Sequence, residues 1–178
     1  MRKMIITSAL FAGGVGVLAI GAVPAFAATG STTPVTVEVT GGALTISAPA
    51  GSVDLGSATA STSAQTVTGH LGDVTVTDNG GSTVGWSATV SAPDFTGPQT
   101  ISTSTWGLVT YSSGAATTTG TVTTVPYTES TLNPGGPATL GTNVSGANTA
   151  TWDPTIAVII PANALAGTYG SSLTHSVS

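Results

Sequence analysis

Two histidines are the only side chains of this sequence that could act as a conventional general base near neutral pH. A serine nucleophile would need a defined Ser, His and Asp constellation, and the sequence contains no Gly-x-Ser-x-Gly elbow. The sequence has no cysteine, and its single lysine is Lys3. After residue 3 there is therefore no thiol nucleophile and no amine that could form a Schiff base. The sequence predicts that the protein is not an enzyme. His70 is interpreted as a surface side chain, and His175, which shares a face with Leu173 and Val177, as a packed or interfacial one.

The acidic side chains give no recognisable metal site. Asp78-Asn79-Gly80 resembles a fragment of a calcium loop, but Gly81, Ser82 and Thr83 do not supply the alternating oxygen ligands and closing Glu of such a loop. The two histidines also lack the close spacing of a metal pair. We expect no metal and no cofactor. A hydrolase that uses two carboxylates at a fixed separation stays as an alternative.

Aromatic side chains are the remaining candidates for a binding site, because aromatic rings stack on the C–H faces of sugars without needing charge. Large aromatic residues also dominate sandwich cores, and the strand phase of Trp86 and Tyr169 favours burial. Trp106, Trp152 and Tyr127 lie beside turn residues and are expected to be more accessible. The candidate binding residues are Trp86, Trp106, Trp152, Tyr111, Tyr127, Tyr169 and His175.

The N-terminal residues have the pattern of a secretory signal peptide. Arg2 and Lys3 precede an apolar run from Ile5 to Val23, and Ala25-Phe26-Ala27 matches the small-x-small cleavage pattern. An uncleaved membrane anchor is the alternative, since the apolar run could nearly span a bilayer. We expect a signal peptide at residues 1–27, a flexible leader at 28–33 and one domain at 34–178. The mature protein is expected to be secreted, and extracellular or associated with the cell wall.

The charge of the mature chain limits its partners. The sequence has two basic residues, both within the predicted signal peptide, and seven acidic ones outside it, so the formal charge after cleavage is 0 − 7 = −7. Binding to nucleic acid depends on Lys and Arg, and so does attraction to anionic lipid. Nucleic acid and the membrane surface are therefore excluded as partners after cleavage. Recognition by hydrogen bonds, aromatic faces and shape remains.

Hydrophobic residues at period two predict strands through most of the chain. Val35, Val37 and Val39 predict a half-buried strand over residues 35–39. Further strands are expected at 44–47, 74–77, 85–90, around 101, at 106–111, 121–125, 155–160 and 168–177.

Turn residues suggest how these strands are connected. Asp78-Asn79-Gly80-Gly81 predicts a hairpin between the strands at 74–77 and 85–90. The stretch from Thr131 to Asn148 is rich in Gly, Pro, Asn and Thr and is expected to be a long loop. No segment favours a helix. The pattern predicts an all-β fold, an antiparallel, immunoglobulin-like β-sandwich that follows the signal peptide.

Several segments resemble the WxL-domain surface proteins of Gram-positive bacteria. The resemblance covers roughly Thr33 to Ser178. It is carried by Leu71–Asp78, Gly85–Val90, Asp94-Phe95-Thr96, Ile160-Pro161-Ala162, Ala166–Tyr169 and Tyr169-x-x-x-Leu173-Thr174. It implies non-covalent attachment to peptidoglycan or another wall glycan.

The two signature motifs of that family are altered in this chain. The first reads Trp86-Ser87-Ala88 and the second His175-Ser176-Val177, whereas Trp106-Gly107-Leu108 is a literal match in a different context. The leading hypothesis is a secreted domain that associates non-covalently with the cell wall. A self-assembling extracellular structural or adhesive subunit without carbohydrate binding is the alternative. Other surface proteins are further candidate partners.

Overall fold

The computed structural model describes residues 30–105, 107–128 and 132–178, and within them it contains strands and no helix. The predicted signal peptide and Trp106 lie outside these residues. The strands are β1 (Leu44–Ser47), β2 (Gln65–His70), β3 (Val74–Asp78), β4 (Trp86–Ser91), β5 (Phe95–Thr96), β6 (Thr100–Ile101), β7 (Val109–Ser112), β8 (Thr117–Pro126), β9 (Gly136–Trp152), β10 (Thr155–Ile160) and β11 (Thr174–Val177).

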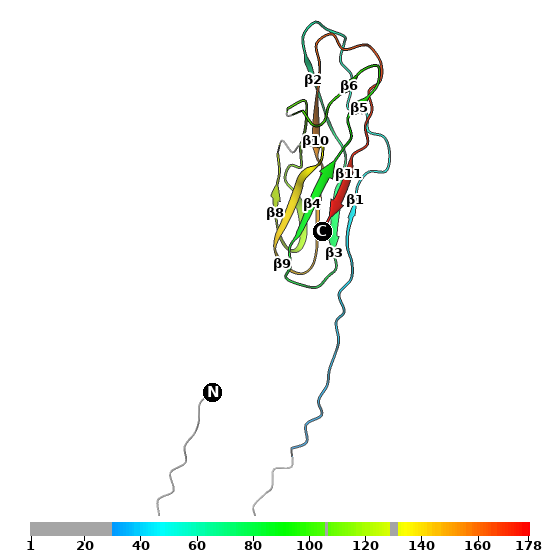
Figure 1. Ribbon diagram of the computed structural model, residues 1–178. Helices are drawn as coiled ribbons and strands as arrows, with labels where there is room; N and C mark the ends of the chain where they lie inside the picture. Colours follow the sequence, from blue (N-terminus) through cyan, green and yellow to red (C-terminus); the bar gives the residue numbers. More distant parts are fainter. Residues whose placement is uncertain (1–29, 106, 129–131) are drawn as a thin grey trace, which may run out of the picture. The chain divides into compact units, whose positions relative to one another are not determined.

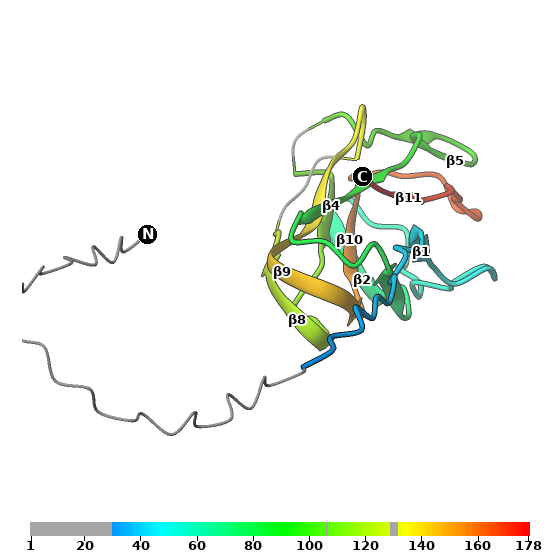
Figure 2. The ribbon, with the colours of Figure 1, turned by 90° about the horizontal axis from the view of Figure 1, so that it is seen from below.

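The strands form two main antiparallel sheets (Figures 1 and 2). The larger sheet has the order β1-β3-β9-β4-β11, and β8 pairs with β9 as well. The smaller sheet has the order β2-β10-β7, and β5 and β6 form a short ribbon. The prediction of an all-β antiparallel sandwich is confirmed.

Alternating side chains from both sheets fill the core. In β3 and β4 every second residue points inward, which buries Trp86, Ala88 and Val90 on one face as expected. Trp86 packs over Gly141 of β9, where a Cβ would lie 2.3 Å from the indole ring. The buried apolar residues are Val74, Val76, Trp86, Ala88, Val90, Ala92, Phe95, Ile101, Val109, Tyr111, Leu132, Ala138, Val144, Ala150, Trp152, Ile156 and Val158.

The predicted loop at 131–148 is wrong from Gly136 onward, because β9 begins there and runs for 17 residues, whereas residues 132–135 belong to no strand. β8 pairs along one edge of β9, and β3 and β4 pair with its two ends. Asn143 and Gly146 have positive φ angles of 51° and 73°, close to the place where the pairing register with β8 shifts. The turn-forming residues therefore lie at irregularities within a strand and do not end it.

The predicted hairpin at 78–81 is also wrong. Asp78 accepts a hydrogen bond from the Gly80 amide at 2.8 Å, and Gly81 has a φ of 65°, so a turn does form. β3 and β4 do not pair with each other, however, because each pairs with β9. Local sequence encodes the turn, but the long β9 provides the partner for both strands.

The predicted strand at 35–39 is wrong as well, because the described residues 30–43 belong to no strand. Val35, Val37 and Val39 are 89%, 90% and 90% exposed. The regular pairing of this part of the chain begins at Gly42, whose amide donates to the Asn79 carbonyl at 2.7 Å. A period-two pattern forms a strand only where a partner strand is present.

Candidate functional site

Three of the seven predicted binding residues are buried in the core. Trp86, Trp152 and Tyr111 are 2%, 1% and 0% exposed, so their rings cannot stack on an external ligand. The expectation that Trp152 is accessible is wrong, because β9 continues to Trp152 and the strand phase directs the indole inward. The same phase buries Tyr111 from β7.

Trp152, Tyr111 and His175 form a chain of hydrogen bonds between the two sheets. The Trp152 Nε1–H donates to the Tyr111 hydroxyl at 3.0 Å, and this hydroxyl lies 3.1 Å from His175 Nε2. Burial raises the pKa of Tyr111 to about 12 and lowers the pKa of His175. In the neutral tautomer that carries its proton on Nδ1, His175 accepts a hydrogen bond from the Tyr111 hydroxyl through Nε2, which completes the chain. His175 is therefore a half-buried packing residue, in agreement with its strand phase.

A second buried network joins β3, β4 and β9. Asn148 accepts from the Trp86 Nε1–H at 3.1 Å and donates to the Asp78 carboxylate at 3.0 Å. It also donates to the Gly146 carbonyl at 3.2 Å. Each polar group here has a partner, so the network stabilises the fold and leaves no donor for a ligand.

The other predicted residues do not gather into a binding platform. Tyr169 is half-buried, and its hydroxyl donates to the Leu165 carbonyl at 2.8 Å. Tyr127 is half-buried at the end of β8, where its backbone bonds to Ser113. Trp106 lies outside the described residues.

His70 lies on the surface, in agreement with its interpretation from sequence. Its Nδ1 is 3.0 Å from Asp153 Oδ2, and the two side chains are 71% and 42% exposed. Asp153 also accepts from the Gly72 amide at 3.0 Å. Among the described residues, no group of three or more His, Cys, Asp or Glu side chains could hold a metal ion.

The outer surface of the larger sheet carries a regular array of hydroxyl groups. β1, β3, β9 and β8 lie side by side in that order, and their outward residues are all Ser or Thr over two adjacent rows. The first row is Ser47, Thr75, Thr151 and Thr117, and the second is Thr45, Thr77, Thr149 and Thr119. We refer to these eight residues as the hydroxyl face.

The spacing of the hydroxyl face follows from strand geometry. Neighbouring strands lie about 4.8 Å apart and alternate residues of a strand about 6.8 Å apart, so the face is a grid about 14 Å wide. Thr75 Oγ1 and Thr151 Oγ1 are hydrogen-bonded at 2.9 Å, which orients the centre of the first row. The four hydroxyl residues on β1 and β8 are exposed, and the four on β3 and β9 are half-buried.

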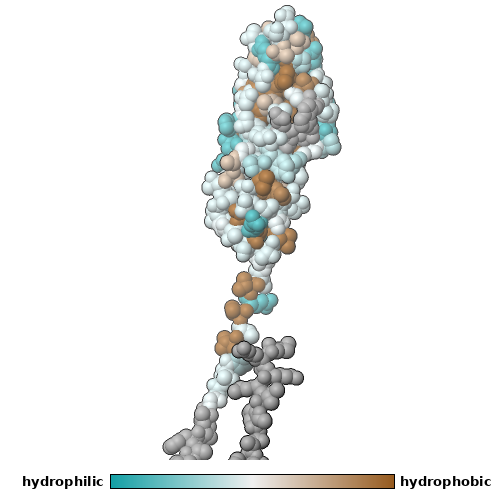
Figure 3. All heavy atoms as spheres, turned by 90° about the vertical axis from the view of Figure 1, so that its left-hand side faces the viewer, coloured by the Kyte–Doolittle hydropathy of each residue, from teal (hydrophilic) through white to brown (hydrophobic). Residues whose placement is uncertain are grey.

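The hydroxyl face was missed from the sequence because it depends on register between distant strands. The alternation Val74-Thr75-Val76-Thr77 indicated a polar outer face of β3. Nothing local indicated that Thr149 and Thr151, within the predicted loop, would lie beside it. Figure 3, which views the molecule from the side of β8 and β9, shows a mostly pale surface of intermediate hydropathy.

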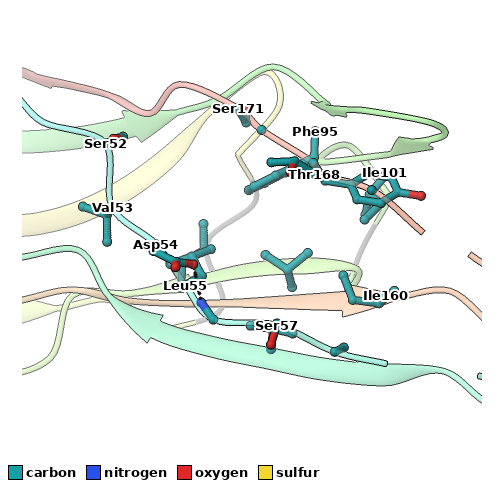
Figure 4. A pocket seen from close by; sticks show the side chains of 18 of the residues that line it. Ser52, Val53, Asp54, Leu55, Ser57, Phe95, Ile101, Ile160, Thr168 and Ser171 are labelled. Atoms are coloured by element: carbon teal, nitrogen blue, oxygen red, sulfur yellow. Dashed lines mark hydrogen bonds between the residues drawn. The ribbon is translucent and has the colours of Figure 1, made fainter. Parts of the chain in front are cut away.

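A groove of about 1030 Å³ lies on another side of the sandwich. It is lined by residues 48–61 and 164–173, which form no strand apart from one isolated bridge at Gly170, and by side chains of β2, β5, β6, β10 and β11. Figure 4 shows Val53 and Leu55 on one side of the groove and Phe95 and Ile101 on the other. The groove contains apolar side chains and small hydroxyl residues.

Within the described part of the chain, no helix is long and apolar enough to cross a membrane. Comparisons with protein-family models, with curated proteins and with solved structures give no match to this chain.

Proposed function

We propose that this protein is secreted and associates non-covalently with the cell wall through its hydroxyl face. The observation that carries the proposal is the registered grid of eight Ser and Thr residues across four strands. A wall glycan presents repeated hydroxyl and amide groups, which can form hydrogen bonds to such a grid. The proposal assigns no catalytic step.

The charge distribution supports a neutral mode of recognition. No residue of the hydroxyl face is charged, and the sequence has no Lys or Arg after Lys3. One neutral hydrogen bond contributes only about 1 kcal/mol in net terms. Useful affinity therefore requires several hydroxyl groups to bind at once along one polymer chain, where each further contact is effectively intramolecular.

In this proposal the ligand binds to hydroxyl groups and not to the aromatic side chains that the sequence suggested. Trp86, Trp152 and Tyr111 support the site from inside, because their burial fixes the strands that carry the outward Thr residues. The resemblance to WxL-domain proteins points to the same kind of ligand, although the altered signature residues Trp86 and His175 have structural contacts here.

Sedimentation with insoluble peptidoglycan tests this function. We expect the purified secreted protein to pellet with the wall material at low salt, and to pellet at least as well at high salt. Ionic binding would weaken as salt screens it, whereas the hydroxyl face has no cation to screen. Protein that stays in the supernatant at every salt concentration would contradict the proposal.

A further inference from the structure

Four core side chains line the groove described above. Ile156 and Val158 of β10 lie there together with Phe95 of β5 and Ile101 of β6, and all four are buried. Figure 4 shows Leu55 across the groove from Phe95 and Ile101. The volume of about 1030 Å³ is at the upper end of the range of about 300–1,000 Å³ that small-molecule sites have. An apolar molecule bound here would leave water, which is favourable.

One polar side chain of the core also lines the groove. His175 of β11 is half-buried there, and its Nε2 lies 3.1 Å from the Tyr111 hydroxyl. That hydroxyl already accepts a hydrogen bond from the Trp152 Nε1–H, so its own proton needs an acceptor. Nε2 of His175 is in place to be that acceptor.

This arrangement leaves the Nδ1–H of His175 as a donor. Burial lowers the pKa of His175, so the ring is neutral near neutral pH, and a neutral ring that accepts at Nε2 carries its proton on Nδ1. Within the described ranges of the chain, no acceptor bonds to this N–H. Small-molecule sites combine apolar walls with a few fixed polar groups, and the groove has this composition.

The charges around the groove disfavour an acidic ligand. Asp54, at the exposed rim, is the one carboxylate among the described residues that line it, and its Oδ1 accepts from the Gly56 amide at 2.9 Å. No Lys or Arg follows Lys3 in the sequence. An anionic group would therefore lose hydration without gaining a cation. A cationic group could pair only with the exposed Asp54, where an ion pair contributes little.

β10 offers no free edge to a peptide. It pairs with β2 on one side and with β7 on the other, so its backbone groups are already bonded. A peptide over Ile156 and Val158 could not add to this strand, and would gain from it none of the main-chain hydrogen bonds that give strand addition its affinity. The same holds for a segment of a second copy and for an N-terminal segment of the same chain.

We propose that the groove binds a neutral small molecule that has an apolar chain and a carbonyl or hydroxyl oxygen. The chain packs over Ile156 and Val158, and the oxygen accepts a hydrogen bond from the His175 Nδ1–H. No residue of the hydroxyl face lines the groove. The inference therefore goes beyond the proposed function and does not depend on binding to the wall.

Nuclear magnetic resonance titration of the secreted protein with methyl octyl ketone tests the site and the class of ligand. We expect the amide signals of Leu55, Ile156 and Val158 to shift with one common dissociation constant. Methyl hexyl ketone has two methylene groups fewer and should bind about fifteenfold more weakly. Decanoate, an anion with the same number of carbons as methyl octyl ketone, should bind at least about tenfold more weakly than that ketone.

Three results of this titration would overturn the proposal. One is the absence of binding, including in a chain whose own N-terminal segment fills the groove. The second is equal affinity for the ketone and for decanoate. The third is a set of shifts confined to residues outside the groove.

The ring of His175 reports the polar contact directly. The nitrogen signal of Nδ1, read through the carbon-bound ring protons, should shift when methyl octyl ketone binds. Decane, which has a similar chain but no acceptor, should shift the amides of Ile156 and Val158 and leave the Nδ1 signal in place. A ketone that shifts these amides without changing the Nδ1 signal would refute the role given to His175.

A matched pair of variants tests the location. Val53→Asp places a carboxylate in the groove and should weaken binding of methyl octyl ketone at least about tenfold, whereas Val125→Asp lies on β8 outside the groove and should bind like the wild type. The two valines are equally exposed, at 42% and 43%, so the substitutions should affect folding similarly. Equal affinity of the two folded variants for the ketone would contradict the proposed site.

Discussion

At the scale of single residues, two hydrogen-bond networks satisfy the polar groups of the buried aromatic side chains Trp86, Trp152 and Tyr111. Asn148 is the centre of one and is 3% exposed, with bonds to Trp86, Asp78 and Gly146. Tyr111 is the centre of the other, between Trp152 and His175. Both networks contain residues that the sequence suggested as ligand-binding candidates, and both give these residues a structural role.

Substitution of Asn148 tests the first network. Asn148→Leu leaves the Trp86 indole N–H without its acceptor and one oxygen of the 5%-exposed Asp78 without its donor. An unsatisfied buried group costs about 1–3 kcal/mol, so the free energy of unfolding should fall by about 3 kcal/mol. Denaturant unfolding measures this change. Ser145→Ala, on an exposed residue of the same strand, is the control, and an equal effect of both variants would refute the role given to Asn148.

His175 makes the second network sensitive to pH. Burial lowers its pKa in the folded state, so between the folded value and the ordinary value of about 6.5 the unfolded chain binds more protons. The stability that neutral His175 contributes should be fully present above about pH 7. It should fall as the pH drops through about 6.5 towards the pKa of His175 in the folded state. The pKa of Asp94 is lowered by the hydrogen bond from the Thr103 amide, so that group acts at more acid pH.

Thermal unfolding from pH 7 to pH 5 checks this dependence on His175. His175→Gln, which keeps a polar partner for Tyr111, should flatten the profile in this range. His70→Gln, at the exposed histidine, should leave the slope attributed to His175 in place. A His175→Gln profile as steep as that of the wild type would contradict the assignment.

At the scale of strands, local patterns predicted where most strands form but not which strands pair. The strands at 44–47, 74–77, 85–90 and 155–160 were predicted nearly to the residue. β9 was missed because Asn143 and Gly146 lie where its pairing with β8 is irregular, and those residue types also form loops. The wrong prediction of a hairpin and the failure to predict the hydroxyl face both follow from missing β9, because β9 is the partner of β3.

The close packing of β9 against β4 makes its own prediction. A Cβ on Gly141 would lie 2.3 Å from the Trp86 ring, so Gly141→Ala should reduce the free energy of unfolding by about 3 kcal/mol. Gly51→Ala is the control, because Gly51 has open space around it and no positive φ. Denaturant unfolding compares the two variants. Equal stability of both would show that β9 can move away from Trp86 without cost.

At the scale of the whole molecule, the distribution of side chains is unusual in two respects. The two basic residues of the sequence are Arg2 and Lys3. The domain therefore has no Lys or Arg that could attract an acidic partner. The aromatic residues whose burial is described are buried or half-buried, so the outer surface is formed largely by Ser, Thr and Gly. Hydrogen bonding over an extended face is the mode of binding that this surface supports best.

The central claim is that the hydroxyl face binds the wall, and a four-site variant tests it most directly. Thr75, Thr77, Thr149 and Thr151 are replaced by Val, which keeps the shape and the strand preference but removes the hydroxyl groups. The control carries Thr89→Val, Ser91→Ala, Thr174→Val and Ser176→Ala, which remove four registered hydroxyl groups from β4 and β11. The hydroxyl-face variant should fold, because it removes both partners of the hydrogen bond between Thr75 and Thr151, which is nearly neutral.

Sedimentation with peptidoglycan then compares the two folded variants with the wild type. We predict that the control variant pellets like the wild type, whereas the hydroxyl-face variant remains in the supernatant. A hydroxyl-face variant that pellets as fully as the wild type would contradict the account.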